Sequence, residues 1–142
     1  MSDWGRAFID ALNSHDSSSV CALVTEDVRY HDIGVGTSVT GVRTFKSAYD
    51  EAETYSTDYT YTLVRDAVAG KCFAVEWVIE GTTSGKEGGL VTTDSGEKIG
   101  GGPAGTPYRL RGVSIGELAA DGKIQEYSDY YNMAEYLRQI GS

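Results

Sequence analysis

DGKIQEYSDYYN, residues 121–132, is the stretch that decides the fold. Its Asp-Gly pair is typical of a tight turn, and the residues that follow alternate as in a β-strand. Alternation places Tyr127, Asp129 and Tyr131 on one face, so a carboxyl group lies between two aromatic rings. If this face borders a closed cavity, loss of solvation raises the pKa of Asp129 and suits it to acid/base catalysis.

Outward from this stretch, the chain predicts helices first and strands afterwards. Apolar residues at helical spacing predict helices over residues 2–13, 17–24, 42–52 and 133–140. Asp16 is placed to cap the second of these helices, and Gly41 precedes the third. A period of two predicts strands over 28–32, 59–64, 72–83, 108–119 and 123–131, with a loop over 33–40 and a small hairpin within 91–99 that turns at 94–96. This order is typical of an α+β domain in which helices cover one face of a curved antiparallel sheet.

Length and charge restrict the class of protein. The 142 residues show no repeat or linker, so we expect one domain over residues 1–142. A formal charge of −9 opposes binding to nucleic acid or to an anionic membrane, because phosphate binding needs clustered Lys and Arg. No basic segment precedes an apolar core near Met1 and no apolar run has membrane-spanning length, so we expect a cytoplasmic protein.

The remaining composition argues against a metal or a cofactor. Cys21 and Cys72 lie in apolar runs and are predicted to be buried thiols, which leaves no disulfide. We expect His15 at a helix junction and His31 on the face opposite Tyr30, so the two rings do not converge on a metal. Ten tyrosines against three phenylalanines favour a pocket or interface that uses hydroxyl groups.

Several segments together resemble the NTF2-like superfamily and, within it, the SnoaL-like polyketide cyclase and ester cyclase group. In chain order they are ALNSHD (11–16), DVRYHD (27–32), Gly41, VEWVIEGT (75–82) and residues 121–141. The resemblance implies a cone in which a curved antiparallel sheet wraps around N-terminal helices and encloses a central pocket. Fold alone does not determine a reaction, so the site residues have to carry the functional argument.

In such a cone, alternation along each strand determines which residues face the pocket. Asp129 matches the acid of the cyclases, and Tyr30 and Asp32 match positions at which related limonene epoxide hydrolases place a Tyr and an Asn that hold water. Trp77 and Ile79 stand where those hydrolases place an Arg and a second Asp, so that catalytic set is absent. The other residues expected in the wall are Val75, Leu110, Gly112, Ser114, Tyr127 and Tyr131, whereas Glu76, Glu80, Arg109 and Arg111 are expected on the outer face, paired with one another or with a second subunit.

Other interpretations of these residues remain open. Asp129 is also placed to cap the last helix, and Asp32 to serve as a turn residue before Gly34. Tyr30 and Tyr127 either hydrogen-bond a substrate oxygen or fill space. If Asp32 and Asp129 share the pocket, their repulsion raises one of the two pKa values.

The resemblance and the parity together predict a cofactor-independent cyclase or isomerase for a hydrophobic, carbonyl-bearing secondary metabolite. Asp129 is the expected general acid/base with Asp32 as a second acid, and Tyr30, Trp77, Ile79, Leu110, Ser114, Tyr127 and Tyr131 are the expected substrate contacts. We also expect a homodimer. The alternatives are an epoxide hydrolase-like enzyme and a non-catalytic domain that binds a small molecule or dimerises; the role of residues 84–106 is open.

Overall fold

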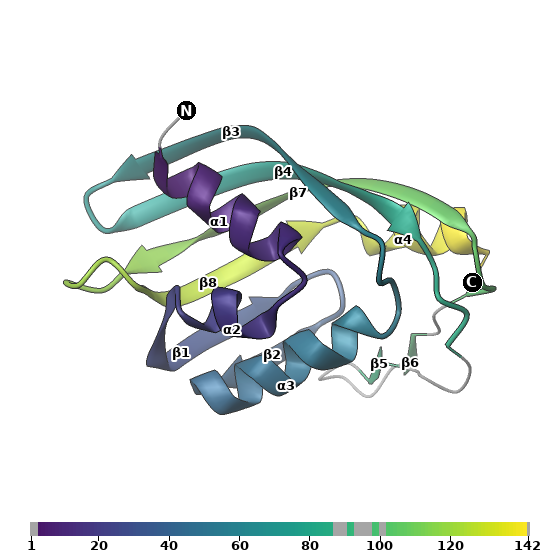
Figure 1. The fold of residues 1–142 in the computed structure, drawn as a ribbon, viewed down its shortest axis with the longest axis horizontal. Helices are drawn as coiled ribbons and strands as arrows, with labels where there is room; N and C mark the ends of the chain where they lie inside the picture. Colours follow the sequence, from purple (N-terminus) through teal and green to yellow (C-terminus); the bar gives the residue numbers. More distant parts are fainter. Residues whose placement is uncertain (1–2, 87–90, 93–97, 100–101, 142) are drawn as a thin grey trace.

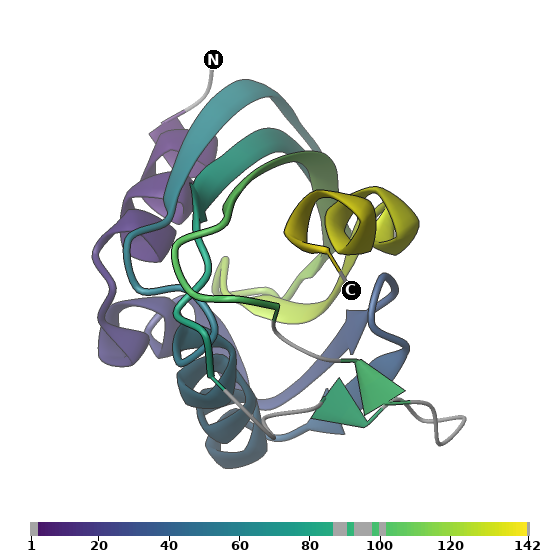
Figure 2. The same ribbon diagram turned by 90° about the vertical axis from the view of Figure 1, so that its right-hand side faces the viewer.

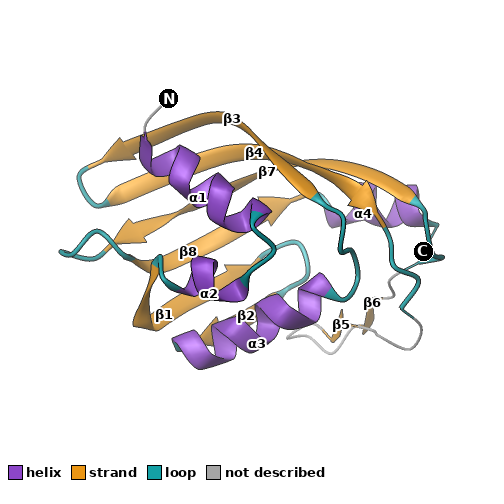
Figure 3. Cartoon of the chain, viewed as in Figure 1, coloured by secondary structure: helices purple, strands orange, loops and turns teal. Residues whose placement is uncertain are grey.

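In a computed structural model of the chain, the structure describes residues 3–86, 91–92, 98–99 and 102–141 (Figure 1). The helices are α1 (Asp3–Asn13), α2 (Ser17–Cys21), α3 (Val42–Glu53) and α4 (Met133–Ile140). The strands are β1 (Val24–Asp32), β2 (Thr37–Thr40), β3 (Thr60–Ala69), β4 (Cys72–Thr82), β5 (Val91–Thr92), β6 (Lys98–Ile99), β7 (Pro107–Leu118) and β8 (Ile124–Tyr131) (Figure 3).

The main sheet has six strands in the order β2-β1-β8-β7-β4-β3. Figure 2 shows how strongly it curls, and Figure 1 shows α1, α2 and α3 on one side of it and α4 at the end away from the β3–β4 turn. Helix α1 packs on β3, α3 on β1 and β2, and α4 on β7. The predicted α+β class and curved sheet are confirmed, but the sheet is mixed, because β1 and β8 pair in parallel.

The core lies between the helices and the concave face of the sheet. Phe8, Ile9 and Leu12 form the buried face of α1, and the Phe8 ring meets Tyr127 edge-on at 6.0 Å between centroids. Val28 and Val75 are completely buried in the strands beneath. This packing occupies one end of the cone, so the other end is free to remain hollow.

Two predicted boundaries are wrong for the same reason, which is strand pairing that local sequence does not show. The second helix ends at Cys21 instead of Val24, because Val24 pairs with Ile124 of β8. Part of the predicted loop over 33–40 is the strand β2, which pairs with β1 from Thr37 to Thr40. The Asp16 cap of α2 is confirmed by its hydrogen bond from the Ser18 amide.

The predicted hairpin within 91–99 is present, since Val91 pairs with Ile99 and Thr92 with Lys98; its turn at 94–96 lies outside the described residues. The prediction of a buried Cys72 thiol is wrong: Phe73, Val75 and Trp77 occupy the inner face of β4, so parity turns Cys72 outward and leaves it exposed. None of the helices in the described ranges has the length and apolarity that crossing a membrane requires.

Candidate active site

A cavity of about 440 Å³ lies inside the cone, at the end that the core packing leaves open. Its wall is largely aromatic, and it includes nine of the ten tyrosines of the chain. The tenth, Tyr130, is 47% exposed on the opposite face of β8. The lining tyrosines are Tyr30, Tyr49, Tyr55, Tyr59, Tyr61, Tyr108, Tyr127, Tyr131 and Tyr136.

Asp129 projects from β8 into this cavity, and three side chains hold its carboxyl group in place. The Ser114 hydroxyl donates to Oδ1 at 2.5 Å and the Tyr30 hydroxyl donates to Oδ2 at 2.6 Å. The Trp77 indole N–H donates in turn to Ser114 Oγ at 2.9 Å. Because the indole occupies a lone pair of Ser114, the serine proton is directed at Asp129.

The environment of Asp129 raises its pKa to about 7. Burial is the largest cause, since it removes water from the charged form. The hydrogen bonds from Ser114 and Tyr30 act in the opposite direction, and the nearby Asp32 carboxyl adds a smaller upward contribution. Asp129 is therefore poised to hold or release a proton near neutral pH.

Asp32 lies in the same cavity wall, at the end of β1. Its Oδ1 accepts hydrogen bonds from the Tyr131 hydroxyl at 2.8 Å and from the Val35 amide at 3.0 Å. Burial raises its pKa, and these hydrogen bonds offset part of the rise. Both interpretations offered by the sequence thus describe Asp32, which anchors a turn and also faces the cavity.

The parallel pairing of β1 with β8 brings the two acids together. Tyr30 lies opposite Tyr127 and Asp32 opposite Asp129, so residues with the same parity face the cavity from adjacent strands. The alternate residue Glu126 lies on the outer face, where it contacts Arg29 and His31. The helix-capping interpretation of Asp129 is wrong, because Asn132 caps α4 by accepting from the Glu135 amide.

Three of the other expected wall residues, Trp77, Ile79 and Leu110, line the cavity. Ser114 was expected in the wall but is 1% exposed and lies behind it against Asp129. Val75 and Gly112 are not among the described residues that line the cavity, because Val75 is completely buried in the core and the Trp77 ring covers Gly112. Tyr127 is 4% exposed and packs edge-on against Phe45, which favours a space-filling role. On the outer face, Glu80 pairs with Arg109 as expected, whereas Glu76 pairs with Arg65 of β3.

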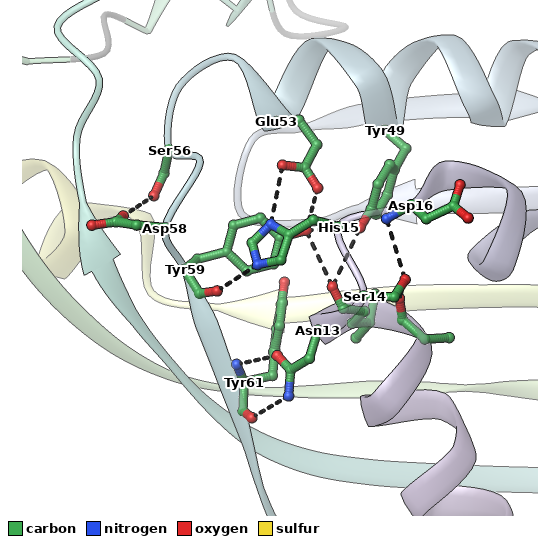
Figure 4. Close-up of polar contacts among 12 residues, drawn as sticks. Asn13, Ser14, His15, Asp16, Tyr49, Glu53, Ser56, Asp58, Tyr59 and Tyr61 are labelled. Carbon is green, nitrogen blue, oxygen red and sulfur yellow. Dashed lines mark hydrogen bonds and ion pairs between the residues drawn. The ribbon is translucent and has the colours of Figure 1, made fainter.

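A second polar cluster in the cavity wall was not predicted (Figure 4). Tyr59 donates its hydroxyl proton to Glu53, and the Tyr49 hydroxyl lies 2.7 Å from that of Tyr59. His15, at the predicted helix junction, donates from Nε2 to the Tyr59 carbonyl at 3.0 Å. The cluster joins His15 to residues 49–59, which lie more than 30 positions further along the chain, and the surplus of tyrosine was the one available signal.

Metal ligands do not converge in the described part of the chain, where no group of three or more His, Cys, Asp or Glu side chains forms a suitable cluster. His31 contacts Ser38 and Glu126 outside the cavity, as expected.

The family model of the SnoaL-like domain matches residues 5–127. Among solved structures, a hypothetical protein with a ketosteroid isomerase-like fold from Catenulispora acidiphila DSM 44928, in complex with trimethylamine, has 18% identity and a TM-score of 0.79 over 99% of this chain and 94% of that one. A protein from Pseudomonas putida KT2440, described as a proposed polyketide cyclase, has 24% identity and a TM-score of 0.70 over 95% and 93%. IdmH of Streptomyces antibioticus, described in the same way, has 19% identity and a TM-score of 0.74 over 96% and 95%. No curated protein matches the sequence.

Proposed function

Because the chain belongs to the SnoaL-like domain family, whose model spans most of its length, we propose that it is an enzyme of the cyclase or isomerase type. The substrate is a hydrophobic, carbonyl-bearing small molecule, and Asp129 is the general acid/base. The observation that carries the proposal is the Asp129 carboxyl, whose pKa is raised to about 7 inside a cavity with largely aromatic walls. A catalytic acid/base works best when its pKa lies near the operating pH.

The proposed reaction begins with ionised Asp129. One carboxylate oxygen removes a proton from the carbon next to the substrate carbonyl, and the C–H electrons form an enolate. In an isomerisation, protonated Asp129 returns the proton to a different carbon. In a ring closure, the enolate carbon attacks a second carbonyl of the same molecule, and Asp129 protonates the alkoxide that results.

The cavity contributes by restricting the substrate. A volume of about 440 Å³ lies within the range that holds a molecule of a few fused rings. Aromatic walls that select one folded conformer remove part of the entropic barrier to ring closure. The Tyr30 and Ser114 hydrogen bonds keep Asp129 in one orientation while this happens.

Proton abstraction can be tested before the substrate is known. The probe is 2-tetralone, a bicyclic ketone, and proton NMR in deuterium oxide follows exchange of its α-protons. We expect the native protein to accelerate exchange over buffer, and Asp129→Asn to lose at least about a hundredfold of that acceleration, as removal of acid/base help does. Asp10→Asn makes the same chemical change on an exposed face of α1 and should leave the rate unchanged. A folded Asp129→Asn variant with nearly native exchange removes Asp129 from the mechanism.

Epoxide hydrolysis is the second candidate, favoured by one observation. Asp32 and Asp129 occupy paired positions of β1 and β8 and face one cavity, as two acids that divide the roles of acid and base would. This activity requires a diol product and loss of turnover in both Asp32→Asn and Asp129→Asn. A third outcome, ligand binding that survives Asp129→Asn without any turnover, identifies a non-catalytic binding domain.

A further inference from the structure

The tyrosine hydroxyls of the cavity wall divide into those that bond another protein group and those that do not. Five of the nine belong to the first set, namely Tyr30, Tyr49, Tyr59, Tyr108 and Tyr131. Within the described ranges, no protein group bonds the hydroxyls of the other four, which are Tyr55, Tyr61, Tyr127 and Tyr136. Buried polar groups in proteins are nearly always paired, so a free hydroxyl in a cavity wall indicates that a bound molecule supplies its partner.

Two of these four hydroxyls lie away from Asp129. Burial raises the pKa of Tyr136 to about 12, and neighbouring tyrosines add to the rise. Burial also raises the pKa of Tyr55, which Lys86 opposes and Glu51 reinforces. The Asp129 carboxyl contributes to neither shift, so these two hydroxyls belong to another part of the wall.

Tyr61 of β3 lies beside Asp129. It is opposite Ile79 in the β3–β4 pair, and both residues line the cavity. The Tyr61 ring packs edge-on against Trp77, with 5.2 Å between the ring centroids. The Trp77 indole leads through Ser114 to the Asp129 carboxyl, so Tyr61 borders the same patch of wall as the proposed acid/base.

The backbone of Tyr61 is fixed on both sides by one side chain. The Asn13 amide nitrogen donates to the Tyr61 carbonyl at 2.9 Å, and Asn13 Oδ1 accepts from the Tyr61 amide at 2.7 Å (Figure 4). Asn13 is the last residue of α1, so the end of this helix sets the position of Tyr61. A ring held in this way offers its hydroxyl to a ligand without having to be ordered first.

The Tyr61 hydroxyl keeps its proton at neutral pH. Burial raises its pKa well above the usual value for tyrosine, and the Asp129 carboxyl is the next largest cause of the rise. Such a group donates a hydrogen bond but does not give the proton away. Asp129 also affects Tyr127, but that ring is only 4% exposed and is packed in the core, so it offers a ligand less surface.

We propose that the Tyr61 hydroxyl binds the carbonyl oxygen of the substrate and stabilises the enolate that forms when Asp129 removes the adjacent proton. The C–H electrons move toward this oxygen, Asp129 takes the proton, and Tyr61 donates a hydrogen bond without transferring its own proton. Tyr30 and Ser114 do not supply this bond, because their protons are directed at Asp129. The inference rests on the proposed function and adds the group that meets the developing charge.

A ketone and a hydrocarbon of the same shape separate the role of the hydroxyl from that of the cavity. The ketone is 2-tetralone, and tetralin lacks its carbonyl. Tryptophan fluorescence follows the binding of each to the full chain, because Trp77 lines the cavity. Tyr61→Phe should lower the affinity for 2-tetralone about fivefold and leave that for tetralin unchanged. Tyr130→Phe makes the same change on the opposite face of β8, at a residue that is 47% exposed, and should alter neither affinity.

The exchange assay measures the same hydroxyl as charge develops on the oxygen. A hydrogen bond to an enolate is stronger than one to a neutral carbonyl, so Tyr61→Phe should slow exchange of bound 2-tetralone about a hundredfold, more than it lowers affinity. The pH at which the exchange rate rises should not change, because Tyr61 does not bond Asp129. This combination separates Tyr61 from a residue that acts through Asp129.

A native exchange rate in Tyr61→Phe at saturating ketone overturns the inference. Equal losses of affinity for 2-tetralone and tetralin also overturn it, since they indicate a structural role only. If the native protein does not accelerate exchange at all, the proposed function fails and the binding comparison alone decides whether Tyr61 meets the carbonyl oxygen. The two proposals therefore fail separately.

Discussion

Asp129 is balanced between opposing influences on one carboxyl group. Burial favours its neutral form, and the hydrogen bonds from Ser114 and Tyr30 favour the ionised form. A pKa of about 7 leaves both forms well populated at neutral pH. The same group can then remove a proton in one step and return it in the next.

Removing one of these donors should shift the balance in a known direction. Ser114→Ala deletes a hydrogen bond that stabilises the carboxylate, so the pKa of Asp129 rises further. Because the ionised form abstracts the proton, the rising limb of the exchange rate against pH should move upward by about one pH unit. Ser128→Ala, on the outer face of β8, is the matched control and should not move it. A profile unchanged in Ser114→Ala contradicts the assigned role of this hydrogen bond.

At the scale of residues, the predictions were correct where alternation along a strand alone decides which way a side chain points. Alternation in residues 127–131 placed Asp129 toward the interior, and the same rule placed Trp77 in the wall. It also turned Ser114 inward, although that side chain lies behind the wall and not in it. The hydrogen bond from Tyr30 was not predicted, because it depends on β1 lying beside β8, 99 residues away in the chain. The pKa of Asp129 likewise depends on burial by distant segments. The sequence therefore predicted that it rises only if the face of the strand borders a closed cavity.

At the scale of elements, two glycines of β7 leave room for different neighbours. Gly112 makes room for a side chain of the cavity wall, and Gly116 makes room for the backbone of β8. A Cβ at Gly112 would collide with the outer edge of the Trp77 ring, whereas a Cβ at Gly116 would collide with the backbone oxygen of Glu126 in β8. A side chain can move aside, but paired backbones cannot separate without loss of hydrogen bonds.

We therefore expect different losses from the two alanine substitutions. Gly112→Ala should push Trp77 into the cavity, slow the exchange of 2-tetralone, and lower the free energy of unfolding by about 1 kcal/mol. Gly116→Ala should lower it by about 3 kcal/mol or prevent folding. Urea unfolding measures both, and equal losses in the two variants would argue against the described β7–β8 register.

Helices were easier to predict than sheet partners. The bounds of α4 agree with the prediction because local signals, the Asn132 cap and Gly141 in a left-handed conformation, set both ends. The parallel β1–β8 pair and the short strand β2 were missed, since they depend on which strands meet in space. Local sequence carries little information on that choice.

For the whole molecule, the distribution of tyrosine connects composition to function. An excess of tyrosine visible in the sequence is concentrated on the inside of one cavity, with apolar rings as walls and hydroxyls that hold three carboxyl groups. The cluster at Glu53 draws on α3 and on the segments that follow α1 and α3, so no single segment of the sequence reveals it. The homodimer stays a prediction.

The most direct test of the account is the titration of the Asp129 carboxyl by carbon-13 NMR in protein labelled at aspartate, with Asp129→Asn identifying the signal. A midpoint near pH 7 is the expected result, because burial in the cavity outweighs the two hydrogen bonds. A midpoint near 4, the value of a fully hydrated aspartate, would contradict the enclosed acid on which the proposed chemistry depends.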